Sequence, residues 1–162
     1  RYGRGQTKAL SSAARRGAAL FFGKGRCAGC HDGENFTDLK FHNIGLYNVN
    51  GAGAYPARDP GAIKITGRAA DKGAFRTPSL RNVALTGPYM HDGSVSGLAE
   101  AIRRHLDSGG TKSPLRDARL VGLKLEDGQV ADLAAFLKSL TDTGFVTNPD
   151  FALPKTACGK PL

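Results

Sequence analysis

The chain is poor in cysteine and methionine and has no long hydrophobic stretch. Among its 162 residues are three cysteines, one methionine and no tryptophan. No run is apolar and long enough to span a membrane, and no segment has the pattern of a secretory signal peptide. Two cysteines lie close together, but a zinc site would need a second ligand pair, so this class of site is disfavoured. The length fits one domain with a core.

Acidic residues are also scarce relative to basic ones. The chain has 23 Lys and Arg against 14 Asp and Glu, a formal net charge of +9. The basic residues are scattered, and no aromatic platform lies among them, which argues against nucleic-acid binding. The charge fits either an ordinary soluble surface or docking to an acidic partner protein, because charge steers protein encounters.

The most informative segment is Cys27-Ala28-Gly29-Cys30-His31. Two cysteines separated by two residues and followed by histidine form the c-type haem attachment motif. Each thiol adds to one vinyl group of the haem, and the histidine becomes the proximal iron ligand. A thioredoxin-like redox pair would need a βαβ context, which this sequence lacks. The motif predicts one covalently bound haem c, and the 22 glycines and 8 prolines predict loops around it.

Covalent haem attachment has a consequence for localisation. It occurs outside the cytoplasm, so we expect a periplasmic or otherwise extracytoplasmic protein whose leader has been removed or lies outside this chain. The third cysteine, Cys158, would there bond to another chain or remain a free thiol.

The predicted fold class is mainly α, with long irregular loops. Helices are expected over residues 9–22, 98–106 and 126–140, where apolar positions recur at helical spacing. Residues 32–75 are rich in Gly, Pro and Asn and predict loop, and the tail from residue 141 predicts irregular structure. In the second helix His105 shares a face with Ala101 and Ile102, so its side chain is expected to point inward.

Residues 75–94 carry a family resemblance. They read FRTPSLRNVALTGPYMHDGS, which closely resembles the C-terminal haem domain of bacterial di-haem cytochrome c peroxidases and their MauG-like relatives. The similarity extends through the haem motif, residues 41–46 and the helix ending at residue 140. It implies a cytochrome c-like haem domain over residues 11–141, between a linker-like segment 1–10 and an irregular tail 142–162.

The resemblance also implies a role. Those proteins carry two haem domains, whereas this chain has one attachment motif. The chain therefore resembles the electron-transferring half, which works with a second redox centre on a missing N-terminal haem domain or on another haem-bearing chain. The alternative is a haem peroxidase that uses hydrogen peroxide at this haem, which would need an open iron position and nearby acid/base groups.

The candidates for the distal iron ligand are His42, Met90, His91 and His105. In the family the distal ligand lies on the helix after the His-Asp-Gly turn, and His105 stands at that place. Met90 is the alternative, because His/Met ligation is common in c-type cytochromes, although phenylalanine is frequent at this position in the family. His42 and His91 are expected to anchor turns. If His105 is instead a core histidine, His91 and His105 become candidate acid/base residues.

Two further pairs of residues are candidates for binding calcium or the haem propionates. Thr86 and Pro88 match positions whose backbone carbonyls bind calcium between the two domains of the peroxidases, and carbonyl oxygens suit this cation. Arg76 and Arg81 are candidates for pairing with haem propionates, because guanidinium forms bidentate bonds to carboxylates; ordinary solvated arginines are the alternative.

Overall fold

The computed structural model describes residues 5–106, 111–152, 156–157 and 160–161 of the chain. The α-helices of this part are α1 (Ser12–Phe22), α2 (Ile63–Thr66), α3 (Leu98–Arg104), α4 (Asp127–Lys138) and α5 (Thr143–Val146). Two antiparallel pairs are formed by β1 (Phe41–His42) with β2 (Phe75–Arg76) and by β3 (Thr156–Ala157) with β4 (Lys160–Pro161). Single 3₁₀ turns cover Thr7–Ala9, Cys27–Gly29, Ala69–Asp71, Val83–Leu85, Ala118–Leu120 and Pro149–Phe151. The predicted fold class, mainly α with long irregular loops, is confirmed.

Helix α1 begins three residues later than the sequence predicted. The Ser11 side chain accepts a hydrogen bond from the Ala14 N–H at 3.1 Å, which satisfies one of the free donors of the first turn. Gly23 follows the helix, and its N–H donates to the Leu20 carbonyl. The haem motif comes next in the chain, so α1 delivers Cys27 to its place.

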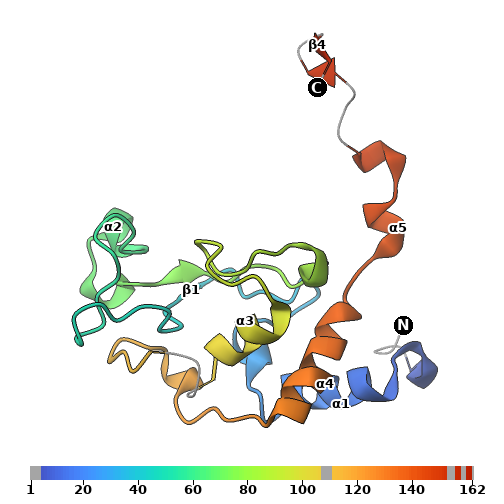
Figure 1. Cartoon of the computed structure of the whole chain (residues 1–162), viewed down its shortest axis with the longest axis horizontal. Coiled ribbons are helices and arrows are strands. Elements are labelled where there is room, and N and C mark those ends of the chain that lie inside the picture. The colour runs from blue at the N-terminus through green and yellow to red at the C-terminus, as the bar shows by residue number, and fades with distance from the viewer. Residues whose placement is uncertain (1–4, 107–110, 153–155, 158–159, 162) are drawn as a thin grey trace.

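Helices α1 and α4 pack side by side, with α3 against α4 (Figure 1). The crossing of α1 and α4 is close at Gly17, where an added Cβ would lie 2.0 Å from the Asp132 carbonyl oxygen. Beside it, the Arg16 guanidinium makes two hydrogen bonds of 2.6 Å to the Asp132 carboxylate. The contact therefore requires a residue without a side chain at Gly17.

Helix α4 supplies much of the core. A capping box between Glu126 and Gln129 starts it, and it ends two residues before the predicted end. Of the apolar stripe predicted from helical spacing, Leu140 is half-buried, and four residues are buried: Val130, Leu133, Ala134 and Leu137. The sequence did not predict the burial of Phe136, whose ring lies 5.1 Å from that of Phe21. The core cluster includes Phe21, Leu80, Val83, Ile102, Leu106, Val130, Leu133, Phe136 and Leu137.

Residues 32–75 are mostly loop, as predicted, but they contain α2 and the strand β1. Phe41 pairs with Arg76 and His42 with Phe75, so β1 and β2 join the start of this loop to the segment after it. The tail was predicted to be irregular, yet it forms α5 and a 3₁₀ turn over Pro149–Phe151, and it leads away from the domain (Figure 1). Cys158 lies outside the described residues. Within the described ranges no helix has the length and apolarity to cross a membrane.

Candidate haem site

A cavity of about 380 Å³ lies inside the domain. This volume is in the range of small-molecule and cofactor sites, about 300–1,000 Å³. Both cysteines of the motif line it, together with His31 and His105. The apolar part of the wall includes Phe21, Leu80, Ile102, Leu106, Leu123 and Leu133. The cavity can therefore exclude water from a large, mainly apolar group.

The proximal wall is built by the motif itself. Residues Cys27–Gly29 form a 3₁₀ turn, entered through the left-handed conformation of Arg26 (φ 52°). The His31 N–H donates to the Cys27 carbonyl at 2.9 Å, which folds the motif into one compact turn. Burial raises the pKa of Cys27 to about 12 and also raises the pKa of Cys30, so both groups are neutral thiols in the cysteine form. The local fold thus places two reduced thiols and an imidazole on one wall.

The His31 imidazole is prepared for metal binding. Its Nδ1 lies 3.1 Å from the Phe36 carbonyl oxygen, which can only accept a hydrogen bond, so Nδ1 carries the proton and Nε2 keeps its lone pair. Burial, together with the nearby His105, lowers the His31 pKa to about 4. At neutral pH the residue is a neutral ligand whose orientation is fixed by its second hydrogen bond.

His105 has the same arrangement on α3. It follows the last helical residue as the C-cap, and its Nδ1 lies 2.8 Å from the Ala101 carbonyl oxygen. Burial lowers its pKa, so this imidazole is neutral as well. Ala101 and Ile102 are buried, and His105 lines the cavity beside them, which confirms the inward direction expected from helical spacing. Its role as iron ligand stays a prediction.

The other ligand candidates differ in what holds them. Met90, in a left-handed conformation (φ 70°), also lines the cavity, so its location leaves it as an alternative. The Nε2 of His91 lies 2.7 Å from an Asp59 carboxylate oxygen, and its ring stacks on Phe75 with centroids 3.5 Å apart. These contacts fit the anchoring role predicted for His91.

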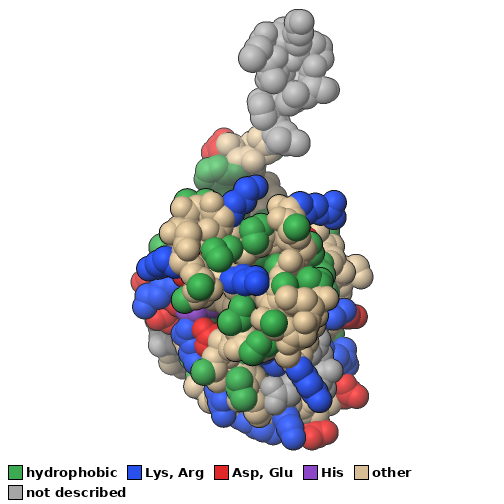
Figure 2. Space-filling view, turned by 90° about the vertical axis from the view of Figure 1, so that its left-hand side faces the viewer, with side chains coloured by type: hydrophobic (Ala, Val, Ile, Leu, Met, Phe, Trp, Pro, Cys, Tyr) green, Lys and Arg blue, Asp and Glu red, His purple; other side chains and the backbone are tan. Residues whose placement is uncertain are grey.

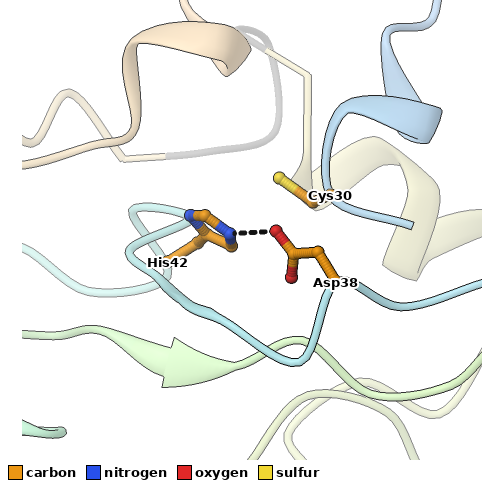
Figure 3. A group of neighbouring side chains, drawn as sticks. All are labelled: Cys30, Asp38 and His42. Atoms are coloured by element: carbon orange, nitrogen blue, oxygen red, sulfur yellow. Dashed lines mark hydrogen bonds and ion pairs between the residues drawn. The ribbon is translucent and has the colours of Figure 1, made fainter. Parts of the chain in front are cut away.

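A charged network lies beside Cys30 (Figure 3). His42 Nε2 is 2.9 Å from an Asp38 carboxylate oxygen and its Nδ1 is 3.0 Å from Asp117, so His42 has the anchoring role expected. Arg119 donates to Asp117 and lowers the pKa of that carboxyl to about 2. Burial alone would raise the pKa of Asp38, but hydrogen bonds, led by that from His42, lower it to about 2. Both carboxylates therefore remain ionised.

This network was not found by sequence reasoning. Asp38 and His42 are four residues apart, but Asp117 lies 75 residues after His42. Among the described residues, Cys30, Asp38 and His42 are the one group of three His, Cys, Asp or Glu side chains close enough to share a metal ion. Because the Cys30 sulfur is the atom that bonds haem in this motif, we assign the group to the edge of the haem site.

The structure places the candidate propionate and calcium residues at different positions relative to the cavity. Arg76 lines the cavity, whereas Arg81 does not. The Arg81 Nε instead donates to the Glu34 carbonyl at 2.9 Å, and its guanidinium lies 5.5 Å from the Phe36 ring centroid. The suggestion that Arg81 pairs with a propionate is therefore not supported by its location, because its guanidinium is directed to the protein. Thr86 and Pro88 lie at the cavity wall, and both are exposed.

These observations define the class of protein. The residues fit a haem: two reduced thiols at the required spacing, a neutral imidazole next to them, a second neutral imidazole in the same cavity, and apolar walls. The site is that of a c-type haem protein. The family model described as cytochrome c matches residues 14–141, and the chain belongs to this family, whose members bind haem c covalently.

Individual relatives indicate which members of the cytochrome c family this chain is related to. The chain is 42% identical over 114 residues to the methylamine utilization protein MauG of Methylorubrum extorquens, covering 70% of this chain and 30% of that protein. It is 37% identical over 101 residues to the cytochrome c551 peroxidase of Pseudomonas aeruginosa, covering 62% and 29%. The chain is thus related to MauG and to the di-haem cytochrome c peroxidases, as the resemblance implied.

A solved structure supports the same relationship. A MauG-like protein associated with microbial copper homeostasis is 41% identical, with a TM-score of 0.83 over 88% of this chain and 47% of that chain. A variant of a diheme peroxidase from Burkholderia thailandensis gives a TM-score of 0.64 at 25% identity. The chain spans less than half of the length of each of these proteins.

Proposed function

We propose that this chain is the electron-transferring haem domain or subunit of a di-haem, MauG-like or peroxidase-like oxidoreductase outside the cytoplasm. Haem c supplies one-electron Fe(III)/Fe(II) chemistry when bound. In this proposal Cys27 and Cys30 would hold the group covalently, and the imidazoles of His31 and His105 would bind its iron. The observation that carries it is that His31 and His105 line one cavity and that the Nδ1 of each lies within hydrogen-bond distance of a backbone carbonyl, so that each neutral imidazole has its lone pair on Nε2.

Electron transfer is favoured over direct peroxide chemistry. A second imidazole on the iron closes the position that peroxide would need, and peroxide cleavage also needs free acid/base groups. His91, a candidate for that task, has its Nε2 on Asp59 and its ring on Phe75. His42 has both ring nitrogens within hydrogen-bond distance of carboxylates. These engaged side chains support the role of an electron carrier.

The decisive experiment replaces each candidate distal ligand in the purified haem-loaded protein. His105→Ala should convert ferric iron from low-spin to high-spin and allow cyanide to bind, because it removes the proposed sixth ligand. Met90→Ala is the matched control, since it removes a side chain from the same cavity, and it should leave the low-spin spectrum intact. The reverse pattern, or a sulfur-to-iron charge-transfer band in the unmodified ferric protein, would show that Met90 is the ligand.

The reduction potential offers a second measurement. Two imidazoles stabilise ferric iron more than one imidazole and a thioether do. The potential should therefore lie below that of an otherwise similar His/Met haem. Met90→Ala should leave this value nearly unchanged, whereas His105→Met should raise it.

We also propose a second haem-bearing domain or chain as partner. The chain spans 30% of the MauG relative and 47% of the MauG-like structure. Large apolar side chains are exposed at Phe22, Leu85, Phe145 and Phe151, by 52% to 64%. Such surface suits burial against another domain. Cross-linking and co-purification from the native source should capture a second haem-bearing chain or show that the native chain is longer. A single-haem monomer without any partner would contradict this proposal and indicate a free-standing electron carrier.

The electron partner is proposed to be acidic. Figure 2 shows a face on which Lys and Arg side chains are more abundant than acidic ones and lie among hydrophobic ones. With the net charge of +9, this surface would steer a negatively charged protein towards the domain.

Calcium is proposed for the assembled protein rather than for this domain alone. Thr86 and Pro88 are exposed, and the described part of the chain brings no group of three His, Cys, Asp or Glu side chains to them. Backbone carbonyls would need further oxygen ligands to complete a calcium site. Calorimetric titration with Ca²⁺ should give no binding heat with the isolated chain and a clear signal with the two-haem assembly. Binding to the isolated chain would contradict the proposed dependence on a second domain.

A further inference from the structure

We propose that Arg116 is a positioning residue that holds His105 in place and thereby keeps the sixth position of the haem iron closed. The inference rests on the proposed function, in which His105 is the distal ligand. The contacts of Arg116 come from a segment that follows α3 in the chain. The sequence alone indicated no role for this residue.

The guanidinium of Arg116 binds the end of α3. Its Nη2 donates to the His105 carbonyl at 2.6 Å and to the Leu106 carbonyl at 3.1 Å. Carbonyls at a helix C-terminus have no partner within the helix, and a cation there also interacts favourably with the helix dipole. A hydrogen bond from a charged donor is stronger than a neutral one. Arg116 therefore fixes the backbone of the residue that carries the proposed ligand.

The Arg116 side chain is itself held in a narrow place. Gly45 has φ +73°, and an added Cβ would lie 3.0 Å from the Arg116 Cδ. Next to it, the Gly45 carbonyl accepts from the Thr111 N–H at 3.0 Å and from the Thr111 hydroxyl. Arg116 is half-buried. The arginine stem thus lies against a loop that has no side chain at the point of contact, which restricts how its guanidinium can move.

The same short segment reaches the proximal side. The Arg119 Nη1 donates to the Gly29 carbonyl at 2.7 Å, inside the haem motif. Between the two arginines, the Asp117 N–H donates to the Asn43 carbonyl at 2.8 Å. We call residues 116–119 the brace. It ties the wall that carries His31 to the helix end that carries His105, so the separation of the two ligands depends on it.

His105 depends on this support because its helix is short. Helix α3 has 7 residues, and the Nδ1 hydrogen bond of His105 to Ala101 spans its last turn. A helix of this length is marginal by itself and is stabilised by tertiary contacts. Without Arg116 the last turn can fray, and His105 can leave the iron more often. Arg116 would then control how readily an external ligand reaches the iron.

The test compares Arg116→Gln with Arg104→Gln in the haem-loaded chain. Both variants lose one positive charge near His105. Among the described residues Arg104 pairs with Glu100 on the exposed side of α3 at 3.2 Å, and its side chain is 40% exposed, which makes it a matched control. The readouts are the high-spin fraction of the ferric spectrum and the rate of cyanide binding, which is limited by departure of the distal ligand.

Arg116→Gln should accelerate cyanide binding by about tenfold or more. A tenfold change corresponds to about 1.4 kcal/mol, which is the size expected for the loss of a charge-assisted hydrogen bond. Arg104→Gln should stay within about twofold of the unmodified protein, as expected for an exposed ion pair. Arg116→Lys keeps the charge but not the fork of donors, so its rate should lie between the two. Equal rates for Arg116→Gln and Arg104→Gln would overturn the proposal.

Two further results distinguish a failure of the positioning role of Arg116 from a failure of His105 as the distal ligand. If Arg116→Gln does not retain haem, Arg116→Lys decides: faster cyanide binding supports the positioning role, and an unchanged rate overturns it. If His105→Ala leaves the iron low-spin, the proposed ligand is wrong, and this inference falls with it. If His105→Ala opens the iron but both Arg116 variants behave like the unmodified protein, only the positioning role fails.

Discussion

The two sides of the cavity are held in different ways. On the proximal side, Cys27, Cys30 and His31 lie within one turn, and the partner of the His31 Nδ1 is Phe36, five residues further along the chain. On the distal side, His105 is the C-cap of a short helix, and Arg116 binds the carbonyls of His105 and of the next residue, Leu106. The proximal geometry is local, and the distal geometry is tertiary. The distal side is therefore where a change elsewhere in the chain can alter the chemistry of the iron.

The largest effect should come from the proximal side. The double variant Cys27→Ser, Cys30→Ser removes both thioether bonds, so the denatured protein should carry no covalent haem by mass spectrometry. The unmodified protein should carry one haem per chain. Cys158→Ser is the control and should retain the haem, because this cysteine is not part of the motif. A covalent haem on the double variant would contradict the assignment of the motif.

The close crossing of α1 and α4 should be important for the stability of the domain that carries the motif. Gly17→Val would place a side chain where a Cβ already comes within 2.0 Å of the Asp132 carbonyl oxygen. We expect a loss of about 3 kcal/mol or more in the free energy of unfolding, at the upper end of overpacking effects. Urea denaturation followed by circular dichroism measures it.

Gly128→Ala is the matched control for that variant. A Cβ at Gly128 would meet no atom within 4 Å, and alanine favours helix over glycine by roughly 0.5–1 kcal/mol. The control should therefore be as stable as the unmodified protein or more stable. A similar loss in both variants would mean that the close helix crossing is not the cause.

The charged network beside Cys30 should show itself through pH. Arg119 holds the folded-state pKa of Asp117 at about 2, below the reference value of 3.8, so the stabilisation is present above about pH 4 and is lost as pH falls towards 2. Asp117→Asn should cost about 1 kcal/mol at pH 6, less than the full shift would give, because solvent screens a partly exposed pair. Urea titrations of both ferric proteins should show this difference shrinking from pH 4 to pH 2. A constant difference would contradict the ionic origin.

The smallest effect concerns the outer surface, away from both ligand walls. Electron exchange with an acidic protein should slow as salt rises, because exposed charges are screened beyond about 10 Å at 0.1 M. Stopped-flow mixing at several salt concentrations measures the rate, and an uncharged small-molecule reductant serves as control. A salt-independent rate with the protein partner would favour docking through apolar contacts instead.

Most of the helical framework could be predicted from the sequence. The three helices expected from apolar spacing correspond to α1, α3 and α4, and the helical spacing around His105 predicted its inward direction. These signals are local, because they depend on residues three or four positions apart. The predicted start of α1 was wrong by three residues, and the predicted C-terminal ends of α3 and α4 were each wrong by two, since caps and tertiary contacts decide where a helix begins and stops.

The contacts that the sequence did not predict join residues that are far apart along the chain. Arg81 faces the Phe36 ring, and Asp117 meets His42 across 75 positions of the chain. Neither contact has a spacing pattern in the sequence. Their partners are chosen by how the loops fold over the cavity, which depends on many weak contacts at once. An arginine close to a predicted haem site therefore has no readable partner until the loops are placed.

The sequence by itself predicted the covalent attachment of haem and the proximal ligand, because thioether chemistry needs the spacing of Cys27, Cys30 and His31. Only the tertiary structure decided how the distal side is held. Arg116 reaches the carbonyl of His105 because the loop at Gly45 leaves room for its stem, and that room is a property of the folded chain. The bonds that attach the haem are written in five consecutive residues, whereas the contacts that fix the distal imidazole exist only after folding.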